Sequence, residues 1–226
     1  QLELVTFAFN EQGQVADQHG RAFTTHLDEA QYQEALKVGF FYTADIPLKQ
    51  PGAYQFRAVL RDAQSGRVGS ASQFIQVPDL RKKRLAMSGL VLSGEPLSLS
   101  GQPTPENALR RQQAELKTAV ALRQFPRNVH LIYAFYVYNA TLNPATKQPD
   151  LWVQAEIYEN GKSVYLGPPR SLKVVDKFDP EHLSFGGELE LKNFKTGDYL
   201  LRVVVTDKLT KQKIGQVDQW MDFSIR

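Results

Sequence analysis

Two stretches of the chain share one alternating pattern of apolar and polar positions. In residues 51–77 every second residue of the leading strand is apolar and most residues between are polar, and residues 196–225 repeat the apolar face. The apolar positions are Tyr54, Phe56, Ala58 and Leu60 in the first stretch, and Tyr199, Leu201, Val203 and Val205 in the second. A period of two with one apolar face predicts a half-buried β-strand. Each stretch is therefore expected to form a turn, a strand, a loop and a returning strand.

The two stretches also match residue by residue. Six identical or similar pairs lie 145 positions apart, namely Gly52/Gly197, Tyr54/Tyr199, Phe56/Leu201, Arg57/Arg202, Val59/Val204 and Asp62/Asp207. Allowing one extra loop residue in the second stretch matches four further pairs, Val68/Ile214, Gly69/Gly215, Gln73/Gln219 and Phe74/Trp220. A duplication of this length predicts two copies of one structural unit.

A glycine stands shortly before the first tyrosine of each repeated strand. This order is typical of the tyrosine corner of Greek-key sandwiches, in which the phenol bonds back to nearby backbone. The other interpretation is that Tyr54 and Tyr199 simply pack in the core. Both interpretations make them structural tyrosines.

The remainder of the first half is predicted to form short strands and one helix. Residues 2–9 alternate weakly and predict a strand whose inward side chains are Val5, Phe7 and Phe9. The other predicted elements are strands at 15–19, 21–27 and 40–48 and a helix that begins at Asp28 and ends near Gly39. Pro78 and the polar run after it predict a domain boundary near residues 78–84.

The second half contains more strands and one long insertion. Strands are predicted at 85–92, 128–141, 171–175 and 187–191, and Asn160–Gly161 predicts a hairpin between 151–158 and 163–166. The other predicted elements are a loop at 95–104, a short helix at 104–117 and a one-turn element at 179–182. No segment in the first half corresponds to residues 85–150, so the first unit is expected to lack its opening strands. An upstream segment or another chain would supply them.

These patterns predict an all-β fold of two tandem immunoglobulin- or fibronectin-like β-sandwich domains with short helical insertions. The first domain spans 1–80 and the second spans 81–226, with the loop and helix insertion at about 95–127. The chain of 226 residues is long enough for two ordinary domains.

Composition narrows the functional classes. Hydrophobic residues make up 42% and charged residues 23%, and no apolar run is long enough to span a bilayer, so no transmembrane segment is expected. The absence of cysteine excludes disulfides, thiolate metal sites and cysteine nucleophiles. A net charge of +3 is mild, and the only basic run, residues 81–84, is interpreted as a solvated linker in preference to an anion-binding site. No nucleic-acid partner is expected.

Several separated runs of the chain together resemble one protein family, the C-terminal region of von Willebrand factor A-related Acidobacterial domain proteins. These runs are FAFNEQGQV, YTADIPLKQPGAYQFRAVLRDAQSGRVGSASQFIQVPDL, GLVLSG, LIYAFYVYNA, YENGKSVYLGPP and YLLRVVVTDKLTKQKIGQVDQWMDF. The resemblance implies an upstream von Willebrand A domain, which would explain the missing strands, and an exported protein whose biochemical role is not established. The family's Asp-x-Ser-x-Ser metal motif belongs to the A domain and does not occur here, so the resemblance implies no metal site in this chain.

No catalytic motif stands out. The four histidines have no zinc-binding spacing, and no Gly-x-Ser-x-Gly elbow is present. His182, near Asp179 and Glu181, is better explained as part of a capped turn than as a metal or acid–base site. Gly161-Lys162-Ser163 lacks the first glycine of a phosphate loop. We therefore expect no enzyme, no cofactor and no metal.

One strand offers a functional alternative. In residues 128–141, Tyr136 and Tyr138 share a face, and Trp152 and Tyr158 share the outward face of the hairpin that follows. If exposed together, the four would form an aromatic platform for a sugar or a protein partner. The alternative is a central strand covered on both sides. The chain is thus expected to be a non-catalytic structural and protein-interaction module of an exported bacterial protein, periplasmic, surface-bound or secreted, with a carbohydrate-binding module as the alternative.

Overall fold

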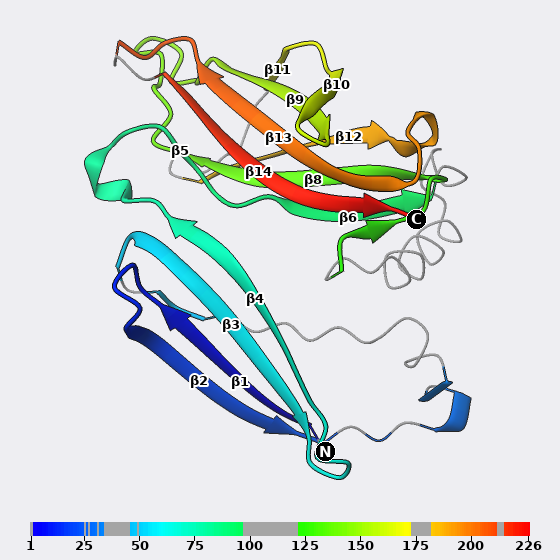
Figure 1. The fold of residues 1–226 in the computed structure, drawn as a ribbon. Helices are drawn as coiled ribbons and strands as arrows, with labels where there is room; N and C mark the ends of the chain where they lie inside the picture. Colours follow the sequence, from blue (N-terminus) through cyan, green and yellow to red (C-terminus); the bar gives the residue numbers. More distant parts are fainter. Residues whose placement is uncertain are drawn as a thin grey trace. The chain divides into compact units, whose positions relative to one another are not determined.

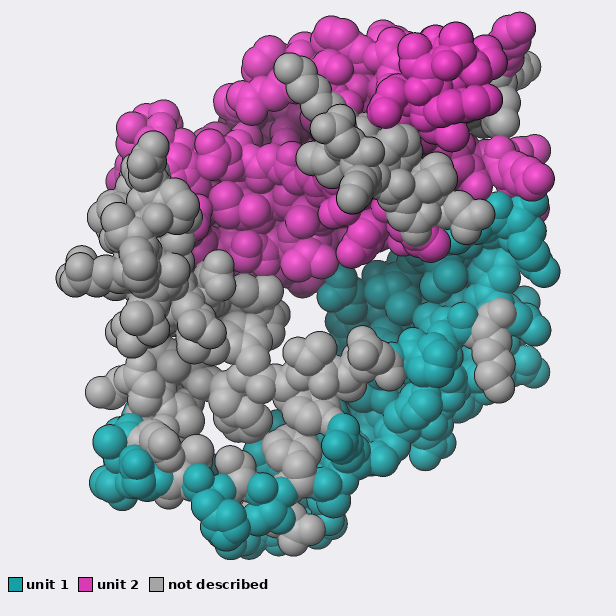
Figure 2. All heavy atoms as spheres, turned by 180° about the vertical axis from the view of Figure 1, so that it is seen from behind, with its two compact units in different colours: residues 1–81 teal, residues 82–226 magenta. Residues whose placement is uncertain are grey.

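The computed structural model describes residues 2–24, 26, 28–30, 32, 33, 46–48, 50–96, 122–172, 182–211 and 215–226. Nearly all the regular structure in these residues is β-strand, which confirms the all-β prediction (Figure 1). The chain forms two compact units, residues 1–81 and residues 82–226, which Figure 2 shows in different colours. Each unit is described by itself below.

Unit 1 contains one four-stranded antiparallel sheet in its described residues. The strands are β1 (Leu2–Phe9), β2 (Val15–Phe23), β3 (Gly52–Asp62) and β4 (Val68–Val77), in the spatial order β2-β1-β3-β4. The strands predicted at 15–19 and 21–27 are one strand, because pairing with β1 continues through Gly20 to Phe23. The second sheet that a sandwich requires is not among the described residues of this unit.

The face of β1 that packs inward differs from the prediction. Thr6 and Ala8 are buried, whereas Val5, Phe7 and Phe9 are only half-buried on the opposite face. The cause is the register with β3, which sets Ala8 opposite Phe56 and Thr6 opposite Ala58. The small side chains of β1 therefore share the face on which β3 carries its larger apolar residues.

Unit 2 is a sandwich of two sheets (Figure 1). The larger, called the β13 sheet here, has the order β10-β9-β13-β14-β7, with β11 also paired to β9. Its strands are β7 (Gln124–Phe125), β9 (Leu151–Glu159), β10 (Lys162–Leu166), β11 (Arg170–Leu172), β13 (Gly197–Asp207) and β14 (Gln216–Ile225). The smaller, called the β8 sheet, consists of β5 (Ala86–Met87), β6 (Val91–Pro96), β8 (Val129–Tyr138) and β12 (Leu183–Glu190). Short 3₁₀ turns lie at Leu80–Lys82 and Leu191–Asn193.

Alternate residues of both sheets of unit 2 form one hydrophobic core. Leu131 and Val137 of β8 face Ile157 of β9 and Leu201 and Val203 of β13, and all five are completely buried. Burial alternates along β8 and β9 with a period of two, as expected for strands with one face on the core. The predicted strand at 85–92 is split into β5 and β6, and both parts pair with β8.

The predicted hairpin around Asn160 is present. β9 and β10 pair antiparallel, and Asn160 and Gly161 both have positive φ, 50° and 76°. These angles are what a two-residue hairpin turn requires. Residues 40–45 of the strand predicted at 40–48 lie outside the described residues, and residues 46–48 are not in a strand. The helix predicted at 104–117 and residues 179–181 of the one-turn element also lie outside the described residues.

The two structural tyrosines make the same hydrogen bond. The Tyr54 hydroxyl donates to the Gln50 carbonyl at 2.7 Å, and the Tyr199 hydroxyl donates to the Lys195 carbonyl at 3.0 Å. Both acceptors lie four residues upstream, and both side chains are 5% exposed. Each tyrosine thus has the bond back to upstream backbone that a tyrosine corner makes, and Tyr199 also packs against Phe194 and Phe223 in the core of unit 2.

The returning strands of the two hairpins pair in a register that the sequence match does not give. Tyr54 pairs with Ile75 and Tyr199 pairs with Phe223, so Ile75 and Phe223 occupy equivalent positions. The loop has five residues in the first hairpin, 63–67, and eight in the second, 208–215. The match of Phe74 with Trp220, which assumed one extra loop residue, is therefore displaced by two. A shift of two keeps each side chain on its face, which is why the sequence pattern conceals it.

We expect Tyr199→Phe to lower the free energy of unfolding by about 1 kcal/mol, because the part-buried hydrogen bond from the hydroxyl to the Lys195 carbonyl is lost while the ring stays in place. Chemical denaturation followed by circular dichroism measures this change. Tyr136→Phe is the matched control, since that side chain is 48% exposed, and it should change stability by less than about 0.5 kcal/mol. Equal losses in both variants would show that the Tyr199 hydroxyl contributes nothing specific.

Candidate functional site

The four aromatic residues expected to form a platform lie in two separate pairs. Tyr136 and Tyr138 point outward from β8, and Trp152 and Tyr158 point outward from β9. β8 and β9 belong to different sheets of the sandwich, so the two pairs lie on opposite outer faces of unit 2. The structure therefore does not bring the four together. The expectation treated residues 151–158 as adjoining β8, whereas β9 pairs with β10, β11 and β13.

The pair on β8 forms a small stacked group. The Tyr136 and Tyr138 rings are 6.4 Å apart, and the Tyr138 ring meets His182 edge-on at 5.7 Å. Tyr136 is 48% exposed and Tyr138 is half-buried. Burial is the main cause that raises the pKa of Tyr138, and the neighbouring Tyr136 adds to it. The Tyr138 phenol is therefore neutral near pH 7, and both side chains offer a polar tip on an apolar ring.

A larger cluster occupies the outer face of the β13 sheet. Tyr158 of β9, Arg202 of β13 and Trp220 of β14 project from three neighbouring strands. The Tyr158 and Trp220 rings are 5.3 Å apart, and the Arg202 guanidinium carbon lies 5.0 Å from the centre of the Trp220 ring. Together with Glu156 and Asp218, these residues are called the Arg202 cluster below.

Two carboxylates hold the guanidinium in place. Nε of Arg202 donates to Oδ2 of Asp218 at 2.8 Å, and Nη1 lies 3.6 Å from Oε2 of Glu156. Nε1 of Trp220 donates to the same Asp218 oxygen at 3.0 Å. The Asp218 carboxylate therefore holds both the Arg202 guanidinium and the Trp220 indole over which the guanidinium lies.

The same contacts perturb two pKa values within the cluster. The hydrogen bond with Asp218 is the first cause that raises the pKa of Arg202. The hydrogen bond with Glu156 is the first cause that raises the pKa of Tyr158. Arg202 stays cationic and Tyr158 stays neutral at physiological pH, so the cluster presents a fixed charge beside a polar aromatic edge. Neither group is poised to exchange a proton near pH 7.

Trp152 lies on the same face, farther along β9. It stands six positions before Tyr158, which is about 20 Å along a strand. Its Nε1 donates to Asp150 at 3.1 Å, and the Lys208 ammonium is 5.9 Å from the ring centre. Trp152 and Trp220 therefore each have a cation near one ring face.

Sequence reasoning did not single out Arg202 and Trp220, although the signal was present. Both residues were matched between the repeats, Arg202 with Arg57 and Trp220 with Phe74. Arg202 interrupts an apolar run at the phase that points away from the core. An outward arginine on one strand of a predicted hairpin and an outward tryptophan on the other place both residues on one face. Their direct contact depends on the register of the pair, which the sequence match does not give.

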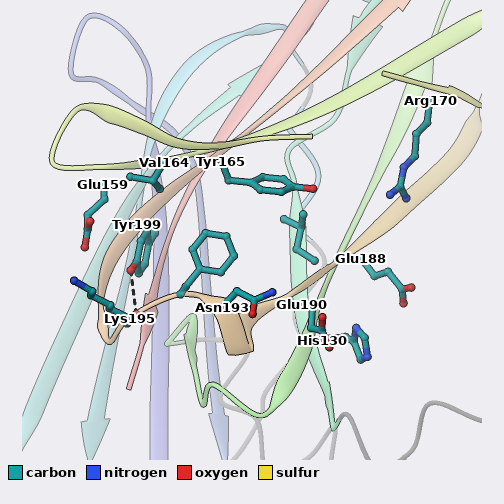
Figure 3. A pocket seen from close by; sticks show the side chains of 12 residues that line it. His130, Glu159, Val164, Tyr165, Arg170, Glu188, Glu190, Asn193, Lys195 and Tyr199 are labelled. Carbon is teal, nitrogen blue, oxygen red and sulfur yellow. Dashed lines mark hydrogen bonds between the residues drawn. The ribbon is translucent and has the colours of Figure 1, made fainter. Parts of the chain in front are cut away.

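A cleft with a volume of about 640 Å³ opens beside the last hairpin (Figure 3). Its apolar surface comes from Tyr165, Phe194 and Tyr199, whose rings meet edge-on at 6.1 Å and 5.8 Å. Figure 3 shows Glu159 and Lys195 at one end and Glu188 and His130 at the other. Glu190 and His130 are direct neighbours across the β12–β8 pair, and both line the cleft.

The described part of the chain contains no group of three or more His, Asp or Glu side chains placed to hold a metal ion. In the same residues no helix is long and apolar enough to cross a membrane. The chain matches no protein-family model, and no curated protein matches it.

We expect Arg202→Met to lower the free energy of unfolding by about 1 kcal/mol or less, because ion pairs and cation–π contacts at exposed positions contribute little to stability. The matched control is Leu201→Ala on the neighbouring residue, which is fully buried and should cost about 3 kcal/mol. Urea denaturation measures both changes. A loss of several kcal/mol in Arg202→Met would mean that the cluster is part of the fold's own stability.

Proposed function

We propose that this chain is a non-catalytic structural and protein-interaction module, and that the Arg202 cluster is its contact surface. The supporting observation is the arrangement of Tyr158, Arg202 and Trp220 on an outer sheet face, with Trp220 43% exposed. Tryptophan, tyrosine and arginine are the residues that dominate the energetics of protein–protein interfaces. A group of all three on one exposed face favours binding to a protein.

The rigidity of the cluster supports the same proposal. Asp218 and Glu156 hold the arginine, and Asp218 also holds the indole. Side chains that are ordered before binding lose less conformational entropy when a partner covers them. The surrounding carboxylates supply a polar rim, which is the usual periphery of such a contact.

Carbohydrate binding is the second candidate, and one observation favours it. Two half-exposed tryptophans and a tyrosine lie on the same outer face of the β13 sheet, at Trp152, Trp220 and Tyr158. A sugar ring needs an open aromatic face on which to stack. The cations near both tryptophans occupy one face of each ring, which leaves a pyranose only the opposite face. Protein contact is therefore the proposal that the geometry supports better.

The cellular setting rests on the resemblance to von Willebrand factor A-related Acidobacterial proteins. On that basis we place the chain in an exported bacterial protein, with an A domain upstream and a protein partner at the cell surface or in the periplasm. The repeated Gly-x-Tyr hairpin adds a structural role to this proposal, because each copy supplies a rigid antiparallel pair.

The test uses the whole chain as immobilised bait in a bacterial cell-envelope extract, with quantitative mass spectrometry of the retained proteins. At least one protein should be retained by the wild-type chain and reduced about tenfold with Trp220→Ala and with Arg202→Glu. Calorimetry with that protein in purified form should show the same loss of about 1.4 kcal/mol or more.

Tyr136→Ala is the matched control, because Tyr136 is an outward aromatic residue on the opposite outer face of unit 2 and is 48% exposed. It should retain the same protein as the wild type. A glycan array run in parallel decides the alternative. Glycan binding that disappears in Trp152→Ala and Trp220→Ala, with no protein dependent on Arg202, would replace the proposal by carbohydrate binding.

A further inference from the structure

The outer strand of the second hairpin receives an additional strand at its end. β7 runs parallel to β14, with Gln124 beside Ser224 and Phe125 beside Ile225. The Ser224 amide donates to the Arg123 carbonyl at 2.8 Å, and the Arg226 amide donates to the Phe125 carbonyl at 3.0 Å. The Phe125 side chain is completely buried. A strand of two residues thus anchors one aromatic ring in the core of unit 2.

The equivalent strand of the first hairpin is β4. The registers place Gln76 and Val77 where Ser224 and Ile225 stand in unit 2. Among the described residues, β4 pairs with β3 alone. Ile75 and Val77 are only half-buried, whereas their equivalents Phe223 and Ile225 are 2% and 0% exposed. The apolar end of β4 therefore lacks the degree of cover that its counterpart has.

β14 and β4 also differ in their charged residues. β14 carries Asp218 and Asp222, and each forms an ion pair, with Arg202 and Arg123 respectively. β4, with the sequence VGSASQFIQV, carries no charged residue over ten positions. Natural proteins commonly place charges on exposed edge strands to prevent pairing with other chains. β4 has no such charge, and Val68 and Phe74 on it are 63% and 68% exposed.

We propose that the edge of β4 is a strand-addition site for an extended segment of a partner protein. The segment runs parallel to the end of β4 and places an aromatic side chain beside Val77, as Phe125 lies beside Ile225. Main-chain hydrogen bonds supply the affinity and the aromatic residue supplies the specificity. β7 on β14 is the example of this pairing within the same chain and gives the direction and the anchor position. Of the two amides that donate to β7, Ser224 has its counterpart in Gln76, whereas Pro78 stands in the place of Arg226 and has no amide to donate.

This site is separate from the Arg202 cluster, because β4 belongs to unit 1 and the cluster belongs to unit 2. Either proposal can therefore be rejected without the other. If the peptide does not bind to a chain whose Arg202 cluster still binds its partner, only the strand-addition site is rejected. Trp220→Ala should leave peptide binding unchanged.

The test is a titration of the full ¹⁵N-labelled chain with a synthetic peptide of residues 120–128, which contains Phe125 in its own sequence context. Amide shifts should change in β4, and the largest should lie between Phe74 and Val77. Val77→Asp should weaken binding at least tenfold, because it places a charge where the aromatic anchor packs. Val68→Asp, the same change at the far end of the same strand, should bind as the wild type does.

A second form of the test requires no change in the protein. The same peptide with Phe125→Asp should bind the wild-type chain at least tenfold more weakly, so a Val77→Asp chain that fails to fold does not obstruct the experiment. Three results would overturn the proposal. These are shifts confined to β14, equal binding by Val77→Asp and Val68→Asp, and sedimentation of the wild-type chain as a dimer that Val77→Asp converts to a monomer.

Discussion

The alternation of side chains along β13 is the constraint on which the rest of unit 2 depends. Tyr199, Leu201, Val203 and Val205 point into the core, so Arg202 must point outward between them. β9 and β14 flank this strand in fixed register, which sets Glu156 and Trp220 on either side of Arg202. The buried core and the candidate contact surface thus both follow from the two-residue alternation of side chains along β13. A shift of β13 by one residue would bury a guanidinium and expose the core.

The two hairpins show how the same local pattern can serve different surroundings. In both, a buried tyrosine hydroxyl bonds to the carbonyl four residues upstream, and an aspartate ends the first strand. Asp62 binds the Gln64 amide within its own loop, and hydrogen bonds from Ser65 and Gln64 lower its pKa. Asp207 is buried and binds the Leu209 amide in the same way, but its second oxygen accepts from Thr141 of another segment. The bonds that shape each hairpin are made within the hairpin, whereas the bond that attaches the second hairpin to the rest of its unit comes from a segment distant in sequence.

Strands and their faces were predictable from the sequence, because a period of two is a local property. The alternation predicted β3, β9 and β13 and the turn at Asn160, and the structure contains each of them. Which sheet a strand joins depends on pairing between residues far apart in sequence. For this reason Trp152 and Tyr136 were placed on one platform although β9 and β8 lie in different sheets. The prediction of the inward face of β1 was wrong for the same reason, because pairing with β3, and not residue size, decides that Thr6 and Ala8 are buried. The candidate site was predicted only in part. Tyr158 was identified as an outward residue of β9, but its proximity to Trp220 of β14 was not predicted.

The electrostatics of the Arg202 cluster change when water leaves it. On an exposed sheet face the ion pair with Asp218 and the cation–π contact with Trp220 are both weakened by solvent, so folding alone gains little from them. A partner that covers the face lowers the effective dielectric constant around charges that are already paired, and each contact strengthens. The cost of burying the guanidinium is partly offset in advance, because Asp218 already accepts a hydrogen bond from its Nε and Glu156 forms an ion pair with it at 3.6 Å. A cluster arranged in this way gains more from being covered than from being exposed, and this is the physical reason for proposing this face of the β13 sheet as the contact surface.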